Sequence, residues 1–240
     1  MKRYFGIICL IGIVMSSCIK SKKENNQLSD EEKKDGWVLL FDGHSKKGWH
    51  LYNKGEIASI WIVKDGEIYC NANNTNDSLE HGDLVTDKVY ENFDLQFEWK
   101  IAEAGNSGVF IDVVERPDIP TAWASGPEYQ LLEKSNQDYA VRSKRSGSMF
   151  GFEPLKDSAE TKPAGEWNQS RIKQVNGKVE FYLNGVLTMQ QDFKSPEWPE
   201  MVAQSGFKVF PQYGKQTKGH IALQAWLKGI SFRNIKIKEL

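Results

Sequence analysis

The chain has 240 residues, with 31 basic and 32 acidic side chains and a formal net charge of −1. Its 40% hydrophobic and 26% charged residues exclude a disordered chain and a polytopic membrane protein, and the balanced charge leads us to expect no nucleic-acid partner. Three cysteines cannot build a disulfide framework, while 12% aromatic residues suit a large β core or a carbohydrate-stacking surface.

Residues 1–17 have the pattern of a secretory signal peptide. Two basic residues precede an apolar run from Tyr4 to Met15, which is followed by Ser16 and Ser17. This run is shorter than the ~20 residues of a membrane-spanning helix. Because Cys18 follows two small residues, as in a bacterial lipobox, we predict cleavage before Cys18 and a lipid anchor on its thiol in the cell envelope. The alternative is an ordinary signal peptide with an incidental cysteine.

Residues 18–35 are predicted to form a flexible tether. Beyond Cys18 they are rich in Lys, Glu, Asn and Ser and contain no aromatic residue, so they cannot bury enough apolar surface to fold. No second linker interrupts the chain after Gly36. We therefore predict that residues 36–240 form one domain.

Alternating apolar and polar residues in this domain predict β-strands. In 93–101, every second residue from Phe93 to Ile101 is apolar, and the pattern returns in 109–113. Asn176-Gly177 and Asn184-Gly185 are typical of tight hairpin turns. The alternation changes parity near Arg233-Asn234, which predicts a β-bulge. Helical turns are expected only around 136–141 and 196–202, so we predict an all-β sandwich or barrel.

Metal and nucleophile motifs are missing from the sequence, which contains no His-Glu-x-x-His, Cys-x-x-Cys or Gly-x-Ser-x-Gly. The four histidines are widely spaced, so we expect surface or hydrogen-bonded roles for them. Polar residues on strands remain. Asp112 is expected to share a strand face with Phe110, and Glu128 one with Gln130. Such a face is either solvated surface or a ligand groove.

The motifs, in order along the chain, resemble the 3-keto-disaccharide hydrolase family. The resemblance spans the whole of residues 36–240. Its segments are Gly36-Trp37-Val38-Leu39-Leu40-Phe41-Asp42-Gly43, His81-Gly82-Asp83-Leu84-Val85-Thr86, Asn106-Ser107-Gly108-Val109-Phe110, Gly126-Pro127-Glu128-Tyr129-Gln130-Leu131, Gly165-Glu166-Trp167-Asn168, Leu183-Asn184-Gly185 and Phe232-Arg233-Asn234-Ile235-Lys236-Ile237.

This resemblance implies a concanavalin A-like jelly roll of two curved antiparallel sheets with a sugar-binding concave face. It also implies cleavage of disaccharides or glycosides that carry a keto group at C3 of one sugar. The keto group acidifies the hydrogen on C2, so a base can remove it and the C1 substituent can leave, after which water adds. Such a site needs a base, a donor for the enolate oxygen and a proton for the leaving oxygen. A divalent metal ion could supply the second of these.

Matched to the family motifs, Glu128 is the expected base or metal-proximal carboxylate, and Asp112 a second acid or a metal ligand. Gln130 is expected to bind sugar hydroxyl groups. The remaining expected substrate-binding residues are His81 and Asp83 at the groove rim, Arg116 and Arg145 as hydroxyl or oxyanion ligands, and Trp123 as an aromatic platform.

Two segments depart from the family pattern. Where many relatives have Leu-Gln-Asp-His-Gly, this chain has Leu223-Gln224-Ala225-Trp226-Leu227, and where relatives often have His-Trp it has Phe181-Tyr182. Trp226 could stack on a sugar ring. Three hypotheses therefore stay open: an enzyme acting on 3-keto-glycosides, a non-catalytic carbohydrate-binding surface lipoprotein, and a structural protein whose concave face is filled by apolar side chains.

Overall fold

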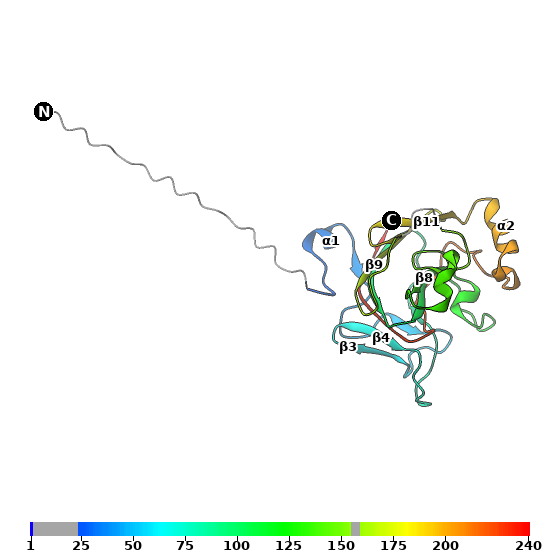
Figure 1. Ribbon diagram of the computed structural model, residues 1–240, viewed down its shortest axis with the longest axis horizontal. Helices are drawn as coiled ribbons and strands as arrows, with labels where there is room; N and C mark the ends of the chain where they lie inside the picture. The colour runs from blue at the N-terminus through cyan, green and yellow to red at the C-terminus, as the bar shows by residue number, and fades with distance from the viewer. Residues whose placement is uncertain (2–23, 155–158) are drawn as a thin grey trace.

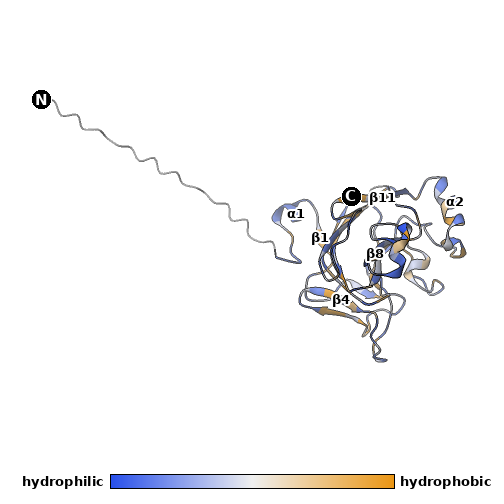
Figure 2. Ribbon diagram, viewed as in Figure 1, coloured by the Kyte–Doolittle hydropathy of each residue, from blue (hydrophilic) through white to orange (hydrophobic). Residues whose placement is uncertain are grey.

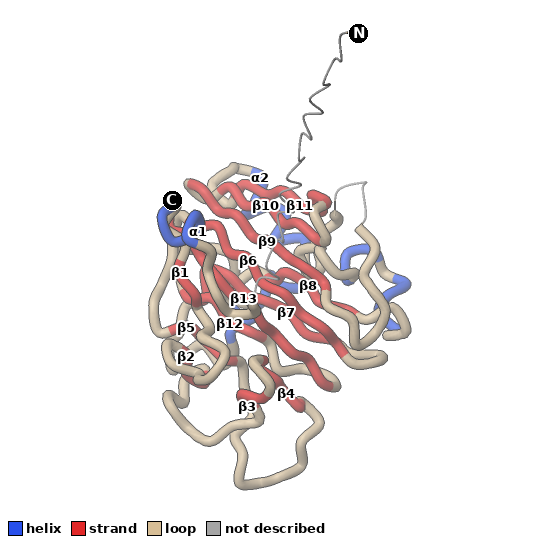
Figure 3. The backbone as a smooth tube through the Cα atoms, turned by 90° about the vertical axis from the view of Figure 1, so that its left-hand side faces the viewer, coloured by secondary structure: helices blue, strands red, loops and turns tan. Residues whose placement is uncertain are grey.

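Two antiparallel β-sheets packed face to face make up the computed structural model, which describes Met1, residues 24–154 and residues 159–240 (Figures 1 and 3). The prediction of an all-β sandwich of two antiparallel sheets is confirmed. Apart from Met1, the predicted signal peptide lies outside the described residues, and so does Cys18. Within them, no helix has the length and apolar character needed to cross a membrane.

Sheet A has the strand order β11-β10-β9-β6-β13-β4-β3, with β1 paired to β13. Its strands are β1 (Val38–Leu39), β3 (Trp61–Lys64), β4 (Glu67–Asn71), β6 (Phe93–Ile101), β9 (Asn168–Val175), β10 (Lys178–Leu183), β11 (Val186–Asp192) and β13 (Gly229–Glu239). Sheet B has the order β2-β5-β12-β7-β8. Its strands are β2 (Trp49–Leu51), β5 (Leu84–Thr86), β7 (Asn106–Val113), β8 (Glu128–Leu132) and β12 (His220–Leu223).

The helices are short and lie in the connections. They are α1 (Asp30–Lys34), α2 (Glu197–Gln204) and the 3-10 helices η1 (Ala122–Ala124), η2 (Gln137–Ala140), η3 (Arg142–Lys144) and η4 (Gly206–Val209). The helical turns expected around 136–141 and 196–202 correspond to η2 and α2.

The core lies between the sheets and follows from strand alternation. Every second residue of β6, from Phe93 to Ile101, is buried in it. Sheet B contributes Val109 and Ile111 from β7, and Tyr129 and Leu131 from β8, to the same core. Side chains at the intervening positions of β7 and β8 therefore point to the outer face of sheet B, the face turned away from sheet A.

The predicted hairpins and the predicted bulge in β13 are confirmed. Asn176 and Gly177 have φ angles of 52° and 82°, as the connection between β9 and β10 requires. In β13 the register against β6 shifts between Arg233 and Lys236, and Asn234 has a φ of 52°. One extra residue at this point returns the apolar side chains that follow to the core.

The expectation of a flexible tether is wrong for residues 24–35, called the N-terminal arm below. Its backbone N–H at Asn26 donates to Asn234 Oδ1 (2.6 Å), and the N–H of Asn234 donates back to Asn26 Oδ1 (2.8 Å). A capping box between Ser29 and Glu32 starts α1, which buries no residue and is coloured hydrophilic in Figure 2. Polar pairing at the bulge, rather than apolar burial, holds the arm.

Asp112 does not lie on the outer face of sheet B, so this expectation is also wrong. The β7–β12 register shifts between His220 and Ala222, and Asp112 has a φ of 55° at this irregularity. Its Oδ1 accepts a hydrogen bond from Gln174 Nε2 of β9 at 2.9 Å. The extra residue in β7 turns Asp112 toward sheet A and leaves Val113 beside Phe110 on the outer face.

Burial raises the pKa of Asp112 to about 7, although the hydrogen bond from Gln174 opposes the rise. Asp112 Oδ2 and Gln174 Oε1 are both buried without a hydrogen-bond partner among the described residues. A proton on Oδ2 would let it donate to the amide oxygen, which gives the neutral acid a matched pair of hydrogen bonds.

We predict that Asp112→Asn raises the free energy of unfolding at pH 8 by roughly 2–4 kcal/mol. The folded pKa exceeds the unfolded value of about 4, so the stability contributed by neutral Asp112 is complete below pH 4 and is lost as the pH rises through 7. Asparagine stays neutral and tolerates the positive φ. Urea unfolding at pH 4, 6 and 8 measures this; an unchanged pH slope in the variant would contradict it.

Candidate functional site

Four residues opposite one another on neighbouring strands form a polar row across the outer face of sheet B. Leu223 of β12 pairs with Leu84 of β5 on one side and with Val109 of β7 on the other. The neighbouring position of β12, Gln224, therefore lies between Asp83 and Gly108. Gln224 N donates to Gly108 O at 2.9 Å, and Gly108 pairs with Gln130. The polar row consists of Asp83, Gln224, Gly108 and Gln130.

The Glu128 carboxyl group lies over Gly108 of this row. A Cβ atom on Gly108 would lie 2.1 Å from Glu128 Oε1, so only glycine leaves space for the acid. Glu128 is 6% exposed. Its strand position is beside the row, opposite Phe110, and the side chain reaches from there toward the middle of the sheet.

The side-chain amide of Gln130 lies 2.8 Å from Glu128 Oε1, and the orientation of this amide decides which of the two groups donates. Burial, and then the charge of Asp83, raises the pKa of Glu128 well above its usual value. A protonated Glu128 can donate to Gln130, whose Nε2 donates to Asn106 Oδ1 at 3.0 Å. Turning the amide would let it donate to an ionised Glu128 instead.

Asp83 supplies the second buried acid. Burial raises its pKa to about 7, while the hydrogen bond from Ala225 N (3.0 Å) to Oδ1 lowers it. Glu128 reaches over β7, and Asp83 reaches toward β12 through Ala225. The charge of Asp83 acts on Glu128, so the two carboxyl groups lie within electrostatic reach of each other. Their different environments favour a mostly neutral Glu128 beside an Asp83 that titrates near neutral pH.

Two further buried polar atoms near these acids have no hydrogen-bond partner among the described residues. They are Gln224 Oε1, in the middle of the polar row, and the hydroxyl group of Tyr213. Burial and then the charge of Glu128 raise the pKa of Tyr213, which places this hydroxyl within electrostatic reach of the acid. Buried unpaired polar atoms indicate a position for water or for hydroxyl groups of a ligand.

Trp226 and His81 lie at the rim of the row. Trp226 is 60% exposed and directly follows Ala225, the residue that binds Asp83. His81 is exposed and precedes Asp83 by two residues. An exposed indole ring thus follows directly after the residue whose backbone N–H binds Asp83.

Arg116 and Arg145 are held by other partners, and Trp123 packs on the apolar part of the same face. Arg116 forms a two-point ion pair with Asp118 (2.8 and 2.7 Å). The Nε of Arg145 donates to the Tyr139 carbonyl at 2.8 Å, and its guanidinium group lies 5.0 Å from the Tyr139 ring. Trp123 packs edge-on against Phe210 at 4.7 Å. The structure thus joins Glu128, Gln130 and Asp83 with His81 and Trp226 at the rim, and separates Asp112 and both arginines from them.

Sequence reasoning missed Asn106, Gln224 and Tyr213. The first two lie in motifs that were singled out, but only strand register shows that they flank the row. Tyr213 follows η4 in a connection, where no periodic pattern marks it. Its ring is stacked 4.0 Å from Phe207, which fixes its position.

Apolar side chains fill the rest of the outer face. They form a cluster of Tyr52, Val85, Phe110, Val113, Ala122 and Ala222, against which Trp123 packs. The hypothesis of a face filled by apolar residues therefore describes one part of it, and the polar row crosses the other part.

The donor set does not fit a metal ion held by the protein. Among the described residues, no three or more His, Cys, Asp or Glu side chains are grouped so that they could hold one. The row offers two carboxyl groups and amides.

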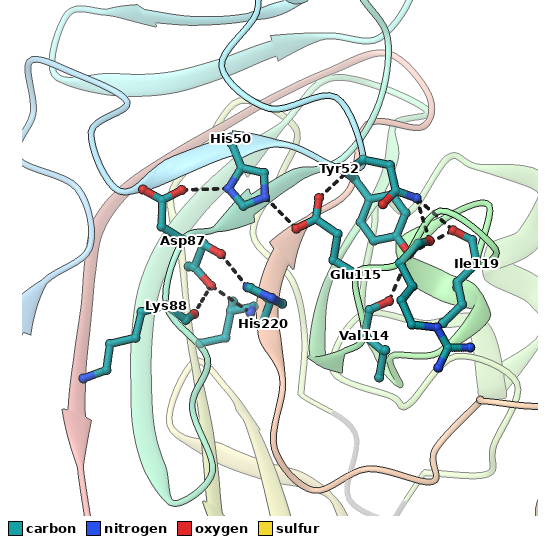
Figure 4. A network of polar contacts seen from close by, with 12 residues as sticks. His50, Tyr52, Asp87, Lys88, Val114, Glu115, Ile119 and His220 are labelled. Atoms are coloured by element: carbon teal, nitrogen blue, oxygen red, sulfur yellow. Dashed lines mark hydrogen bonds and ion pairs between the residues drawn. The ribbon is translucent and has the colours of Figure 1, made fainter.

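A second polar network lies at the other end of the same face (Figure 4). His50 Nδ1 lies 2.7 Å from Asp87 Oδ1, and His50 Nε2 lies 2.7 Å from Glu115 Oε2. Glu115 also accepts from the backbone N–H of Asn53 (2.6 Å). The ring of His220 lies 6.2 Å from that of His50. The network ties the start of the β7–β8 connection, which carries η1 and Trp123, to β2.

Residues 36–238 match the model of the 3-keto-alpha-glucoside-1,2-lyase-like domain. The chain is 29% identical over 230 residues to a 3-keto-disaccharide hydrolase of Bacteroides thetaiotaomicron, covering 86% of this chain and 79% of the relative. A crystal structure from Parabacteroides distasonis, provisionally described as a glycosyl hydrolase, has a TM-score of 0.82 at 32% identity and covers 90% of this chain and 100% of its own. A second from that organism, at 24% identity and a TM-score of 0.65, covers 85% and 99% and shares the fold.

We predict that His50→Gln weakens the attachment of the β7–β8 connection below pH 7 and has a smaller effect at pH 9. Burial lowers the pKa of His50, but the hydrogen bonds and charges of Glu115 and Asp87 outweigh it and raise the pKa. The stabilisation by protonated His50 is complete below the unfolded value of about 6.5 and is lost as the pH rises through the raised folded value.

Hydrogen exchange of amides in 114–126 measures this attachment. Exchange in the variant should be faster at pH 6 and close to wild type at pH 9, after correction for intrinsic rates. An equal difference at both pH values would contradict a role for the histidine charge.

Proposed function

The chain belongs to the 3-keto-alpha-glucoside-1,2-lyase-like domain family, and from this we propose that it cleaves the glycosidic bond of 3-keto-disaccharides or 3-keto-glycosides. The observation that carries the proposal is the pair of buried carboxyl groups, Asp83 and Glu128, in a row of amide side chains. The relative from Bacteroides thetaiotaomicron is named 3-keto-disaccharide hydrolase, which supports this substrate class.

The reaction proceeds by elimination and then hydration. A base removes the proton on C2, the electron pair forms a C1–C2 double bond, and the C1–O bond breaks with protonation of the leaving oxygen. Water then adds its hydroxyl group to C1 and a proton to C2. The sum is hydrolysis into a 3-keto sugar and a free alcohol.

Asp83 is the base in this proposal and Glu128 the acid. A carboxyl group with a pKa of about 7 is partly ionised at neutral pH and still basic enough to accept a proton. Burial, and then the charge of Asp83, raises the pKa of Glu128 well above its usual value, so Glu128 is suited to hold a proton for the leaving oxygen. This assigns the base to Asp83 rather than to Glu128, because the backbone N–H of Ala225 donates to Asp83 and stabilises its ionised form.

The amide groups and Tyr213 are suited to the oxygen atoms of the sugar. Negative charge develops on the keto oxygen as the C2 proton leaves, and buried N–H or O–H donors stabilise it. The Tyr213 hydroxyl is a buried donor without a partner among the described residues, and the unpaired Gln224 Oε1 can accept from a sugar hydroxyl group. Trp226 at the rim presents a ring on which a sugar can stack.

The exposed indole also favours a second candidate function, carbohydrate binding without turnover. The family pattern has an Asp-His pair where this chain has Ala225-Trp226. If catalysis required that pair, the row would still bind sugar hydroxyl groups. Binding of a 3-keto-disaccharide that is lost in Trp226→Ala, with no product formed by either protein, would establish this function.

We predict that Glu128→Gln lowers kcat/KM for a 3-keto-disaccharide by at least about 100-fold, the usual contribution of a positioned acid or base. Glutamine has nearly the same shape and fits over Gly108, so the fold should be retained. The effect is measured by chromatography of the product that the purified protein releases.

Wild-type kcat/KM should rise as Asp83 ionises near pH 7 and fall when Glu128 loses its proton.

Asp112→Asn is the matched control, because this acid is also buried in sheet B but faces the opposite side. It should keep wild-type turnover. Full activity in Glu128→Gln, or an equal loss in both variants, would contradict the assigned roles.

We propose in addition that Cys18 carries a lipid anchor in the cell envelope. The pattern of residues 1–18 supports this. Expressed in a bacterium that processes lipoproteins, the protein should fractionate with membranes, and Cys18→Ser should move most of it to the soluble fraction. Membrane association that survives this substitution would contradict the proposal.

A further inference from the structure

A groove of about 540 Å³ lies on the outer face of sheet A, opposite sheet B and the polar row. The N-terminal arm forms one wall through Glu24, Asn25 and Gln27, and strands of sheet A form the floor. The volume is in the range of small-molecule binding clefts. Figure 3 shows the floor strands β10, β9, β6 and β13 side by side.

The floor is built from outward-facing residues in register. Gln96 of β6 pairs with Lys236 of β13 on one side and with Arg171 of β9 on the other. Arg171 in turn pairs with Tyr182 of β10. One position along, Glu98 pairs with Gln169. Strand pairing therefore places the amides of Gln96 and Gln169 and the ring of Tyr182 on the same face of sheet A.

The charged groups of the floor are already paired within the fold. Arg171 donates from Nε and Nη2 to Asp94 (2.8 and 2.5 Å). Glu98 accepts from Arg233 Nε at 2.7 Å, and Lys236 donates to Glu32 at 2.5 Å. Because each floor charge has a partner of opposite sign, the groove is not suited to a charged ligand.

Free hydrogen-bonding capacity remains on uncharged groups. The side-chain amides of Gln96 and Gln169 make no hydrogen bond to the described part of the chain, and each offers donors and an acceptor side by side. The Tyr182 hydroxyl is fixed by a hydrogen bond to Glu180 Oε2 (2.8 Å). Amides beside an aromatic ring match neighbouring hydroxyl groups and the apolar face of a sugar.

We propose that this groove is a second carbohydrate site, which binds a neutral oligosaccharide without reacting with it. The bulge at Asn234 makes the site possible, because it holds the arm against the sheet and so creates the second wall. The proposal does not rest on turnover at the polar row, which lies on the other side of the sandwich.

The test is calorimetric titration of the purified protein with maltohexaose, cellohexaose and laminarihexaose. At least one should bind, and the double variant Gln96→Ala/Gln169→Ala should weaken that binding at least tenfold. These amides have no hydrogen-bond partner in the described part of the chain, so the variant should unfold like wild type. Tyr182→Phe, which removes only the hydroxyl group, should bind nearly as well as wild type because the ring is retained.

Glu128→Gln and Trp226→Ala serve as controls at the other face and should leave this affinity unchanged. Absence of binding by all three hexasaccharides at millimolar concentration would overturn the proposal. Binding that is abolished by Trp226→Ala and unaffected by the double variant would also overturn it, since the sugar would then occupy the polar row. Turnover of a 3-keto-disaccharide is measured separately, so the two proposals fail independently.

Discussion

Sheet B buries two carboxyl groups on its outer face without a basic partner, and the proposed chemistry depends on how the surrounding strands accommodate them. None of the ion pairs found in the described part of the chain includes Asp83 or Glu128. An ionised carboxylate in such a place is costly, so the raised pKa values are the expected response. Gly108 leaves space for one acid, and a backbone N–H partly offsets the burial of the other. Two buried acids whose pKa values are both raised are suited to the proton transfers of an elimination.

Two β-bulges, at Asp112 and at Asn234, determine which surface of the sandwich the nearby polar residues face. At Asp112 the extra residue in β7 turns an acid toward sheet A, where it binds Gln174 and leaves the outer face to Glu128. At Asn234 the extra residue in β13 frees an N–H group and a side-chain amide, and both bind the N-terminal arm. The first bulge leaves Asp83 and Glu128 as the two acids at the polar row. The second creates the groove on sheet A.

The two polar surfaces differ in a way that fits different roles. On sheet B the acids are buried without a basic partner and lie close to polar atoms that have no hydrogen bond within the described residues. This is the pattern of a reactive site. On sheet A the charges are neutralised by neighbours, and the free groups are amides. Reactive groups need unusual proton affinities, whereas recognition of a neutral sugar needs only fixed donors and acceptors.

The sequence by itself determined the class of fold, the positions of the hairpins and the bulge in β13, because alternation with period two and Asn-Gly turns are local properties of the chain. It also pointed to Glu128, Gln130 and Asp83 through motifs. Tertiary structure alone decided that Asp112 leaves the site, that Gln224, Asn106 and Tyr213 join it, and that residues 24–35 dock on β13. Each of these depends on register between strands distant in sequence, or on a hydrogen bond across about 200 residues such as Asn26 to Asn234. No local sequence pattern predicts such pairings, because the partners come into contact only when the two sheets have assembled.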